Sequence, residues 1–574
     1  MKINDVERQT GLSQKAIRLY EAKGLLRVAR RENGYRDYSE EDVTVLRQIK
    51  LLREAGISIT DIKLYFDGVT TLNETVDKRK REILGESGRQ SDQYAFCERL
   101  AEGLTAGYGG EPDVFAEPEE LSARSLGPLA VGIDLGTTTV SAVVLDLASG
   151  AQVEVYTLPH QSYLKTGIFS EQSVSQIVQK AERLLQHIVK EYPGVVSVGL
   201  TGQMHGILYV DARGRAVSPL INWLDKRGDQ PLGEGRSTCE EIRRVTGETV
   251  STGYGLVTHF YNQRHGQIPP EAVGFCSIMD YLGMRLCGRE RALTHTSVAA
   301  SFGLFEVETG AFQRDRLSAL AIDPAFLPEV TGENRLIGHW EGIPVAVAIG
   351  DNQASFLGSV GDSRESVLVN VGTGAQVSAV IRRPVEARGD LEVRPFLSGH
   401  FLICGSTLCG GEAYAMLERF FRDYAIRAGL PDAPQYPVMN ALAEAAEAAD
   451  AALTVDTAFA GKRSDPGHRG SIGPIDRQSF TPGALILGVL DGMAEELCGL
   501  YRAFPSKMTR VVASGGAVRR NSVLKRRLEK CFGLPVSVSR IQEEAATGAA
   551  LFGALCTGRI AYDNGFSDYI HYDE

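Results

Sequence analysis

The chain has 574 residues, of which 43% are hydrophobic and 23% charged, and its net charge at pH 7 is −11. This length predicts three or four globular domains. No stretch approaches the ~20 apolar residues of a membrane span, and the nine cysteines lack the CxxC spacing of a zinc site or the pattern of a disulfide framework. The first five residues lack the apolar core of a signal peptide, so we expect a cytoplasmic protein without a membrane partner.

Charge is divided unevenly along the chain. Residues 1–82 carry 17 Lys and Arg against 14 Asp and Glu, whereas the remainder carries 44 against 58. Between Lys15 and Arg36 there are seven basic residues and two acidic ones. Because phosphate contacts require positive charge, this segment is a candidate for binding nucleic acid. The acidic remainder is typical of an enzyme that does not itself bind DNA.

Residues 1–70 have the layout of a helix-turn-helix followed by a basic wing. Gly11 marks the turn between two short helices, and Ser13 is a candidate N-cap for the second helix, from which Lys15 and Arg18 project. The pair Asn33-Gly34, flanked by basic residues, is a strong signal for a hairpin. The sequence therefore predicts an α-rich winged helix-turn-helix domain that binds DNA.

A further helix is predicted to begin after Ser39, where three acidic residues follow at the positive end of the helix dipole. Apolar residues continue from there at helical spacing, at Val43, Leu46, Ile49, Leu52, Ile59 and Ile62. We predict a charged helical connector over residues 71–104. Residues 105–127 are rich in glycine, proline and acids, which is typical of a linker.

From residue 129 onward, strand and helix patterns alternate to about residue 561. One device occurs twice: a strand, a glycine-threonine turn and a second strand, at 129–134 with 140–145 and at 366–371 with 376–381. This repeat predicts two α/β lobes of related design, at residues 128–362 and 363–561. Residues 562–574 are expected to form a C-terminal tail.

The two turns indicate a site for nucleotide phosphates. Glycine lets backbone N–H groups approach phosphate oxygens, and neighbouring hydroxyls add donors. One such turn is equally consistent with an ordinary hairpin, but a second turn and the glycines after the strand 510–513 favour the nucleotide, and no P-loop sequence is present. The predicted nucleotide-binding residues are Gly136, Thr137, Thr138, Gly372, Thr373, Gly515 and Gly516. Asp134 is predicted to hold a metal ion through water.

Asp351 is the candidate catalytic residue. It follows the apolar run 345–350 and is therefore expected at the carboxyl edge of a strand, where open α/β sheets bind ligands. Phosphoryl transfer to an alcohol needs a base that accepts the hydroxyl proton, and an aspartate can serve as that base. The alternative is that Asp351 caps the next helix, and the two roles are compatible.

Three more polar clusters follow predicted strands of the first lobe. Gln203-Met204-His205 ends the strand 195–200, Trp223 stands beside Asp225, and Asp280 follows the apolar run 275–279. An aromatic platform beside a carboxylate suits a sugar. Each cluster also has a structural interpretation, since a lone histidine more often serves only as a hydrogen-bonding group. Their recurrence at strand ends favours substrate binding.

The first ~70 residues resemble the MerR family of winged helix-turn-helix regulators. The resemblance rests on two motifs, Ile17-Arg18-x-Tyr20-Glu21-x-x-Gly24-Leu25-Leu26 and Asn33-Gly34-Tyr35-Arg36-x-Tyr38. It implies double-stranded promoter DNA as a partner and a homodimer formed through the connector helix. It places Lys15 and Arg18 on the recognition helix and assigns DNA-backbone contacts to Tyr20, Arg36 and Tyr38.

Residues 129–561 resemble the FGGY family of carbohydrate kinases. Matching segments are Asp134–Thr138, Thr201–Gly206, Asp280-Tyr281-Leu282, Gly350-Asp351-Asn352, Gly372-Thr373, Gly461–Pro466 and Ser514-Gly515-Gly516. The resemblance implies an actin-like, ribonuclease-H-like fold in both lobes, ATP and Mg²⁺ as cofactors, and Asp351 as the base. It adds Asn352 to the substrate-binding residues.

Within this family the sequence is similar to ketose kinases of the sedoheptulokinase and xylulokinase kind. The motif Gln203-Met204-His205-Gly206 supports this, and Gly515–Asn521 is more similar to the sedoheptulokinase kind, which adds Asn521 to the nucleotide-binding residues. His295 departs from the pattern, because xylulokinases commonly carry an acid there.

The sequence therefore predicts ATP-dependent phosphorylation of a ketose at its terminal hydroxyl, in a chain that also carries a DNA-binding regulator domain. One alternative is a sugar-sensing transcriptional regulator whose kinase body only binds its ligand. Another is an N-terminal domain that dimerises without binding DNA. The residues identify neither the ketose nor the operator sequence.

Overall fold

The computed structural model of the chain describes residues 1–26, 28–30, 35–86, 97, 100, 126–232, 235–387, 389–465, 467–563 and 565–573. Two predictions fall outside these residues, the hairpin turn at Asn33-Gly34 and most of the linker. The described residues form two compact units, one built mainly from residues 1–125 and the other mainly from residues 126–574.

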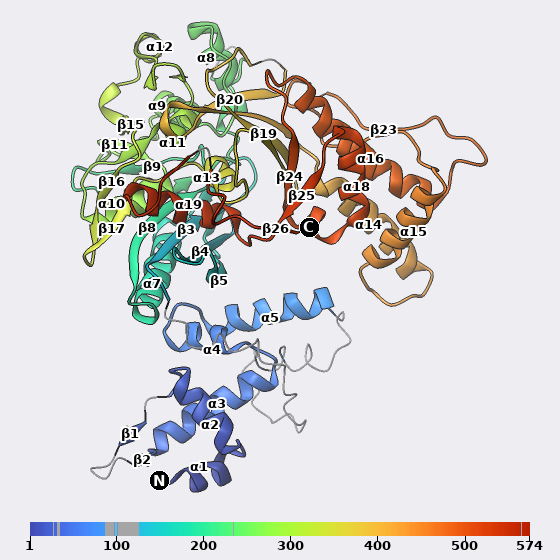
Figure 1. Cartoon of the computed structure of the whole chain (residues 1–574). Helices are drawn as coiled ribbons and strands as arrows, with labels where there is room; N and C mark the ends of the chain where they lie inside the picture. The colour runs from blue at the N-terminus through green and yellow to red at the C-terminus, as the bar shows by residue number, and fades with distance from the viewer. Residues whose placement is uncertain are drawn as a thin grey trace. The chain divides into compact units, whose positions relative to one another are not determined.

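The first unit is a helical domain with a two-stranded sheet (Figure 1). Its elements are α1 (Ile3–Thr10), α2 (Gln14–Ala22), β1 (Ala29–Arg30), β2 (Arg36–Asp37), α3 (Glu40–Glu54), α4 (Ile59–Phe66) and α5 (Leu72–Glu86). Gly11 ends α1 in the left-handed conformation, with φ of 68°. At the start of α2, Ser13 accepts a hydrogen bond from the backbone N–H of Ala16, so the predicted turn and cap are confirmed.

The caps and the apolar stripe of the first unit also follow the prediction. Ser39 Oγ accepts from Asp42 N at 3.0 Å, while Ser39 N donates to the Asp42 carboxylate at 2.7 Å. The stripe is buried in the domain core, at Val43, Leu46, Ile49, Leu52 and Ile62. The chain turns at Gly56, with φ of 76°, so this stripe belongs to the two helices α3 and α4. The connector prediction is met by α5 as far as residue 86.

The second unit contains two large sheets, one in each lobe (Figure 1). Their orders are β16-β17-β8-β3-β4-β5 and β20-β21-β19-β18-β24-β25-β26. The first comprises β3 (Leu129–Leu135), β4 (Thr139–Asp146), β5 (Gln152–Pro159), β8 (Val195–Gly202), β16 (Leu336–Trp340) and β17 (Ile343–Ala346). The second comprises β18 (Ser366–Val371), β19 (Ala375–Ile381), β20 (Leu391–Pro395), β21 (Phe401–Thr407), β24 (Arg510–Ser514), β25 (Val536–Ser539) and β26 (Tyr572–Asp573).

Both sheets are built around the same pairing. β3 pairs antiparallel with β4 and parallel with β8, and β18 pairs antiparallel with β19 and parallel with β24. The two lobes of related design are therefore confirmed. Each glycine-threonine turn follows the first strand of its hairpin, so each lies at the carboxyl end of that strand, beside the end of a parallel neighbour.

Helices and short strands complete the second unit. The helices are α7 (Val174–Glu191), α8 (Thr238–Thr246), α9 (Gly255–Arg264), α10 (Ile278–Cys287), α11 (Thr296–Ala299), α12 (Arg314–Ala319), α13 (Asp351–Leu357), α14 (Gly411–Arg427), α15 (Tyr436–Ala448), α16 (Pro482–Arg502), α17 (Gly516–Arg520), α18 (Ser522–Phe532) and α19 (Glu544–Cys556). The short strands are β6 (Tyr163–Lys165), β7 (Glu171–Gln172), β9 (Leu208–Val210), β10 (Leu220–Ile221), β11 (Gly274–Cys276), β12 (Leu293–His295), β13 (Phe305–Glu306), β14 (Ala311–Phe312), β15 (Glu329–Thr331), β22 (Val455–Asp456) and β23 (Ser471–Ile472).

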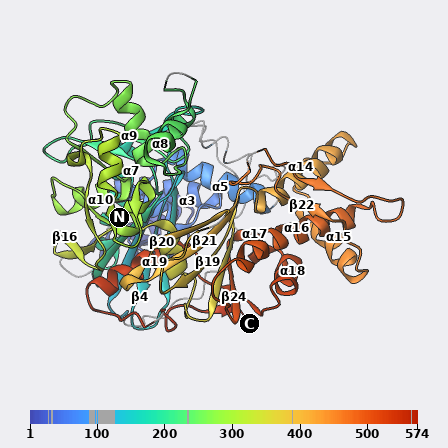
Figure 2. The ribbon, with the colours of Figure 1, turned by 90° about the horizontal axis from the view of Figure 1, so that it is seen from above.

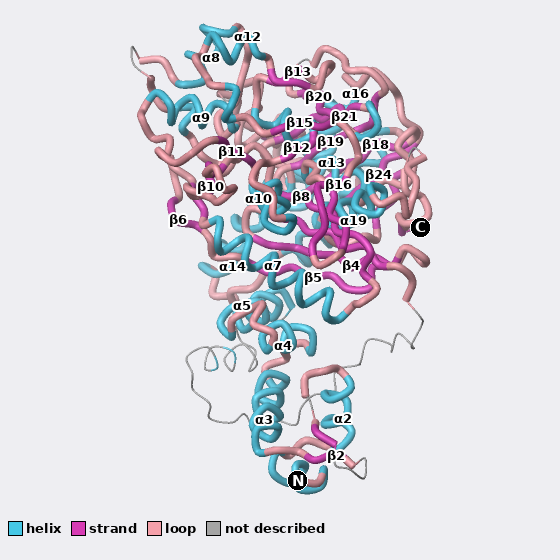
Figure 3. The backbone as a smooth tube through the Cα atoms, turned by 90° about the vertical axis from the view of Figure 1, so that its left-hand side faces the viewer, coloured by secondary structure: helices cyan, strands magenta, loops and turns pink. Residues whose placement is uncertain are grey.

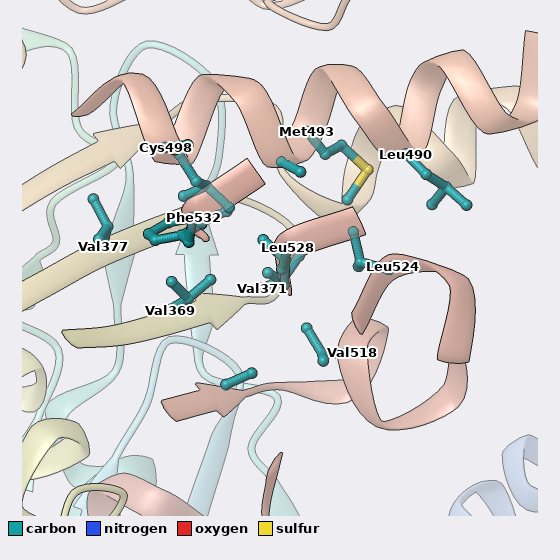
Figure 4. Packing of buried hydrophobic residues seen from close by; sticks show 14 of the residues in the cluster. Val369, Val371, Val377, Leu490, Met493, Cys498, Val518, Leu524, Leu528 and Phe532 are labelled. Carbon is teal, nitrogen blue, oxygen red and sulfur yellow. The ribbon is translucent and has the colours of Figure 1, made fainter. Parts of the chain in front are cut away.

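Alternate residues of β18 face two different layers of helices. Val369 and Val371 pack against α16 and α18, with Leu490 and Leu528 among their neighbours in the same core (Figure 4). These two helices lie along one side of the sheet, as Figure 2 shows from above. Leu368 faces the other way and joins the core that contains α13 and α19. The sheet is thus covered on both faces, as its continuous apolar runs predict.

α13 and α19 lie between the two sheets, among strands of both lobes (Figure 3). The backbone of α19 approaches those of α13, β3 and β8 so closely that only glycine fits at four positions. A Cβ on Gly132 of β3 or Gly199 of β8 would overlap carbonyl oxygens of α19, and a Cβ on Gly548 would overlap the carbonyl oxygen of Ala354 in α13. Gly358, directly after α13, would overlap α19 in the same way. This packing fixes α13, which begins at Asp351, against the strand ends of the first lobe.

Two predictions about strand ends need correction. Asp280 does not follow a strand directly: β11 ends at Cys276, and Asp280 lies in the first turn of α10, where Ser277 is the cap. The cap favours a helix there because Ser277 Oγ accepts from the backbone N–H of Asp280. Asp351 is the first residue of α13, and Gly350 rather than Asp351 is its N-cap. No helix among the described residues is long and apolar enough to cross a membrane.

The close packing of α19 predicts that Gly548→Ala destabilises the second unit. Alanine in a helix interior gains about 1 kcal/mol of propensity over glycine, so a net loss reports the overlap with Ala354. Overpacking of this kind costs about 1–3 kcal/mol or more. Thermal unfolding followed by circular dichroism should show a lower midpoint for the variant.

The matched control is Gly499→Ala in the interior of α16, where a Cβ meets no atom within 4 Å. It should leave the midpoint unchanged or raise it slightly. Equal midpoints for Gly548→Ala and Gly499→Ala would contradict the packing described for α13 and α19.

Candidate functional site

Two adjoining cavities open at the carboxyl ends of β3, β8 and β18, each with a volume of about 260 Å³. The first is lined by Asp134, Gly136, Thr137, Gln203, Asp351, Asn352, Ser355, Leu368, Asn370, Gln376 and Ala545. The second is lined by Met204, His205, Trp223, Asp351, Asn352, Asn370, Gly374, Ala375, Gln376, Arg394, Ser406, Thr407 and Arg463. They share Asp351, Asn352, Asn370 and Gln376, so the predicted base lies where the cavities meet.

The start of α13 holds Asp351 in place. Its Oδ1 accepts from the backbone N–H of Asn352 at 2.7 Å. Behind it, the N–H of Gly350 donates to Ser297 Oγ at 3.1 Å, and Ser297 lies 2.8 Å from His295 Nδ1. His295, which replaces the acid of xylulokinases, is buried and lines neither cavity. It therefore supports the loop before the base.

Two carboxyl groups in the first cavity have raised pKa values. Burial, together with the neighbouring carboxylates of Asp351 and Glu543, raises the pKa of Asp134 to about 8. Burial also raises the pKa of Asp351 to about 6, and the guanidinium of Arg394 limits this rise. Ionising both groups would therefore place uncompensated negative charge at the end of β3, beside the first glycine-threonine turn.

The chemistry of these groups fits a magnesium ion. A divalent cation beside Asp134 would offset the repulsion between the carboxylates, and carboxylate oxygen is a ligand that Mg²⁺ prefers. The described part of the chain holds no cluster of three or more His, Cys, Asp or Glu side chains able to ligate a metal together. Such an ion would therefore take most of its ligands from water and from substrate phosphates.

The second cavity offers neutral polar groups beside an aromatic ring. The ring of His205 stacks on Tyr254 at 4.7 Å between centroids, and its Nδ1 lies 2.8 Å from the carbonyl oxygen of Ser301. Because a carbonyl only accepts, Nδ1 carries the proton and Nε2 is left as an acceptor. Burial lowers the pKa of His205 to about 4, so the ring is neutral at neutral pH. Trp223 is 45% exposed and donates from Nε1 to Thr137 Oγ1 at 3.0 Å.

Two arginines of the second lobe, Arg394 and Arg463, face this cavity. Arg394 had no signal in the sequence, and Arg463 lies in the segment Gly461–Pro466 but was not among the predicted site residues. Arg394 of β20 donates to Glu392 at 2.6 Å, and Arg463 donates to the same carboxylate at 2.7 Å. Although burial alone would raise it, the two cations lower the pKa of Glu392 to about 2. Arg394 Nη1 also contacts the sulfur of Met204, at 3.9 Å. The second lobe thus brings positive charge to Asp351.

Several predicted residues lie outside both cavity walls. Asp225 is buried, accepts from Ser170 N and Arg227 N, and so fixes its own loop. Asp280 bonds Ser277 and Thr294 in the core, where burial raises its pKa to about 7. These contacts do not support the substrate contacts predicted for the two carboxylates. The nucleotide candidates outside the walls are Thr138, Gly372, Thr373, Gly515, Gly516 and Asn521.

The nucleotide candidates of the second lobe nevertheless have defined local positions. Gly515 has φ of 92°, and a Cβ there would lie 2.5 Å from the carbonyl oxygen of Val371, so only glycine fits between β24 and β18. Gly516 begins α17, and Asn521 caps α18 by accepting from Leu524 N at 3.0 Å. Gly372 and Thr373 form the exposed second turn. A nucleotide role for these residues stays a prediction.

In the first unit the predicted DNA-binding residues divide into two groups. Lys15 and Arg18 are exposed on α2, and Arg36 pairs with Glu21 at 2.5 Å. Tyr20 and Tyr38 are buried in the domain core, with 6% and 2% of their surface exposed. Their burial does not support the predicted backbone contacts, because apolar packing around α2 and α3 occupies both rings.

Family models match nearly all of the described chain outside the connector and linker. Residues 129–363 match the N-terminal domain of the FGGY family of carbohydrate kinases, and residues 367–556 match its C-terminal domain. Residues 1–69 match the model of MerR HTH family regulatory proteins.

Individual relatives agree with these matches. Sedoheptulokinase of Mus musculus is 27% identical over 470 residues, which cover 74% of this chain and 97% of that protein. Xylulose kinase of Streptomyces coelicolor is 26% identical, covering 76% and 89%, and gluconokinase of Bacillus subtilis is 23% identical, covering 77% and 90%. Among solved structures, gluconate kinase from Lactobacillus acidophilus superposes with a TM-score of 0.69 at 17% identity, over 78% of this chain and 92% of that one. The two-lobe, actin-like fold is therefore confirmed.

The raised pKa of Asp134 predicts that Asp134→Asn stabilises the ligand-free protein, and more so at higher pH. A carboxyl group whose pKa rises on folding contributes stability that is fully present below the pKa of the unfolded group, about 4. That contribution is lost as the pH rises through about 8. Asparagine carries no charge to repel, so the variant's advantage should grow by on the order of 2 kcal/mol between about pH 5.5 and about pH 8.

Thermal unfolding of wild type and variant across this pH range measures the difference. Asp315→Asn, at an exposed position of α12, is the control and should track the wild type. Parallel curves for Asp134→Asn and wild type would show that the Asp134 carboxyl has an ordinary pKa.

Proposed function

The chain belongs to the FGGY family of carbohydrate kinases, and we propose that it transfers the γ-phosphoryl group of ATP to the terminal hydroxyl of a ketose. The observation that carries this proposal is the position of Asp351, which lines both cavities where they meet. On one side lie Asp134 and the Gly136-Thr137 turn, and on the other lie His205 and Trp223. A base between a turn that offers donors to phosphate and a cavity whose polar and aromatic groups suit a sugar is the arrangement that phosphoryl transfer to an alcohol requires.

Asp351 acts as the base in this proposal. With a pKa of about 6 its carboxylate is ionised at neutral pH and can accept the proton of the sugar hydroxyl. The hydroxyl oxygen then forms the new bond to the γ-phosphorus, the bond to the bridging oxygen breaks, and ADP leaves. Most of the catalysis comes from positioning and charge neutralisation, so the exact placement of α13 by α19 matters as much as the basicity of the carboxylate.

The first cavity would receive the triphosphate. Backbone N–H groups of the Gly136-Thr137 turn are donors for phosphate oxygens, and the second turn at Gly372-Thr373, which precedes the cavity residue Gly374, would add donors from the other sheet. Asp134 would hold Mg²⁺ through water. When bound, the ion would neutralise charge on the phosphates and relieve the repulsion among the carboxylates.

The second cavity would receive the sugar. Nε2 of His205 can accept a hydrogen bond from a sugar hydroxyl, the amide of Asn352 offers both a donor and an acceptor, and Trp223 presents an apolar ring. Sedoheptulokinase and xylulose kinase among the relatives favour a ketose of five to seven carbons. A gluconokinase relative makes gluconate the comparison substrate in any panel.

The first unit would bind promoter DNA as a dimer. Support comes from the match to MerR HTH regulatory proteins and from the exposure of Lys15 and Arg18 on α2, the second helix of the helix-turn-helix. A domain that binds a promoter acts where the DNA is, so the proposal places the chain in the cytoplasm. The kinase body and the DNA-binding domain would then link sugar phosphorylation to transcription.

The alternative is a regulator whose kinase body only binds sugar. Its supporting observation is the fusion itself, because a sensor domain fused to a promoter-binding domain needs no turnover. Asp134, Asp351 and the turn glycines favour the enzyme, since a pure sensor has no use for a base with a raised pKa.

Asp351→Asn separates enzyme from sensor. Loss of a general base lowers turnover by about 10²- to 10⁴-fold, while the neutral amide keeps the shape of the sugar cavity. We expect sugar-dependent ADP formation from MgATP to fall by that factor, and sugar binding measured by calorimetry to change little. In the wild type, kcat/KM should fall as the pH drops below about 6, where Asp351 becomes protonated.

The matched control is Asp315→Asn, which makes the same change at the exposed surface of the same lobe. Unchanged turnover in Asp351→Asn would refute Asp351 as the base. A wild type that phosphorylates neither gluconate nor any ketose of five to seven carbons would refute the kinase proposal.

The DNA-binding proposal predicts a loss of affinity in the double variant Lys15→Ala, Arg18→Ala. Removing two phosphate contacts from each protomer of the dimer should weaken binding to the DNA upstream of the gene and lower the salt slope of log K by roughly 4. Gel shifts over a series of salt concentrations measure both. Arg264→Ala, which removes an exposed charge from the second unit, should have no effect. Equal affinities for the double variant and the wild type would rule out α2 as the DNA-contacting helix.

A further inference from the structure

Gln172, at the end of β7, is completely buried and uses every hydrogen-bonding group of its side chain. Nε2 donates to the carbonyl oxygen of Thr137 at 2.9 Å and to Ser162 Oγ at 3.1 Å. Oε1 accepts from Gln203 Nε2 at 3.1 Å and from Asn222 Nδ2 at 3.0 Å. A primary amide has two donor hydrogens and two acceptor lone pairs, so none remains unused.

These bonds fix the orientation of two side-chain amides, first that of Gln172 and then that of Gln203. The carbonyl of Thr137 can only accept, so Nε2 of Gln172 must point to the turn and Oε1 must point to Gln203. Gln203 must then present Nε2, which also donates to the carbonyl oxygen of Gly136 at 3.3 Å. Both of its protons are used on the protein, and its Oε1 has no partner among the described residues. The Gly136-Thr137 turn thereby decides which end of Gln203 is available.

The side chain that carries this oxygen lines the first cavity, and the oxygen itself is buried. Gln203 lines that cavity together with Asp134 and Asp351, and only 4% of its surface is exposed. A buried acceptor without a partner is costly unless a ligand supplies a donor. Sugar hydroxyls and metal-bound waters are donors of this kind, whereas a flipped Gln203 amide would place its oxygen against the oxygens of Gly136 and Gln172.

The second acceptor bond of Gln172 reaches the loop that carries Trp223. Asn222 donates to Gln172, and its own Oδ1 accepts from Leu224 N at 3.0 Å. This second bond joins the residues on either side of Trp223. Trp223 in turn donates from Nε1 to Thr137 Oγ1. Gln172 therefore holds the backbone of Thr137, while the loop it supports holds the side chain of the same residue.

We propose that Gln172 is a positioning residue that fixes the phosphate-binding turn and the sugar-binding groups relative to each other. This inference rests on the proposed kinase function. Through the turn and Gln203 it places polar groups of the first cavity, which would receive the triphosphate, and through Asn222 it places the indole of Trp223 in the second cavity, which would receive the sugar. A defect at Gln172 should thus impair both substrates together, although its side chain touches neither cavity.

Gln172→Glu tests the proposal with the least change in shape. An ionised carboxylate has no donor for Thr137 and repels its carbonyl, so the turn and Trp223 should be displaced. At about pH 8 we expect kcat/KM for the ketose to fall about tenfold to a hundredfold and KM for ATP to rise with it. A protonated carboxyl regains one donor, so the ratio of variant to wild-type activity should recover as the pH falls to about 6.

The charged neighbours of position 172 permit this comparison. His160 approaches through Ser162, and burial keeps its pKa below the ordinary value. Glu171 is paired with Lys165 and Arg227, which outweigh burial and lower its pKa. Both shifts move the titration of these groups away from the range between about pH 6 and about pH 8. The cavity carboxyls do titrate in this range, but they do so in both proteins, and the ratio removes their effect.

A fluorescence measurement makes the test independent of turnover. The chain has two tryptophans, so Trp340→Phe leaves Trp223 as the only indole. In that background Gln172→Glu should shift the Trp223 emission at about pH 8, because the bond to Thr137 is lost, and the shift should reverse at about pH 6. Gln176→Glu adds the same charge at an exposed position of α7 and should change neither emission nor activity.

The outcomes separate this proposal from the kinase proposal. Wild-type KM values, turnover and emission in a folded Gln172→Glu would overturn the positioning role. If that variant does not fold, Gln172→Met replaces it, and the same losses without recovery at low pH support the role, whereas wild-type behaviour overturns it. If the wild type phosphorylates no sugar, the kinase proposal fails and the emission of Trp223 still decides the role of Gln172.

Discussion

The arrangement of the second unit depends on one steric constraint, the backbone contact of α19 with α13 and with β3 and β8. Glycines at 132, 199, 358 and 548 allow carbonyl oxygens to approach where any Cβ would overlap them. Because α13 begins at Asp351, this contact sets the distance between the base and the strand end that carries Asp134. Interiors packed at this density transmit small displacements, so α19 governs a site whose residues come from both lobes.

Charge at the site is shared between the lobes. The first lobe contributes Asp134 and Asp351, whose burial raises both pKa values, with repulsion from Asp351 adding to the rise for Asp134. The second contributes Arg394 and Arg463, which share Glu392. The arginine beside the base keeps its pKa near 6, low enough for ionisation at neutral pH. The charge of the base therefore depends on both lobes, because burial raises its pKa and an arginine of the opposite lobe lowers it.

Features set by neighbouring residues could be predicted from the sequence, and features set by distant ones could not. The caps at Ser13 and Ser39, the paired hairpins and the cavity positions of Asp351, Gln203, His205 and Trp223 all follow local patterns. Asp225 and Asp280 belong to similar patterns, but Ser170 and Ser277 bind their carboxyl groups inside the fold. Arg394 contacts Met204, which lies 190 positions away in the chain, and the four hydrogen-bonding partners of Gln172 all lie outside β7. Neither residue has a local signal that marks it.

The central claim is that one site, formed where the two cavities meet at Asp351, passes a phosphoryl group directly from nucleotide to sugar. A single-turnover experiment with the labelled γ-phosphoryl group of ATP tests it most directly. The account predicts that, with a suitable ketose, the label moves in one step into a sugar ester at the terminal carbon, and that without sugar little label is released. Label appearing only as inorganic phosphate, at the same rate with and without every ketose tested, would contradict it.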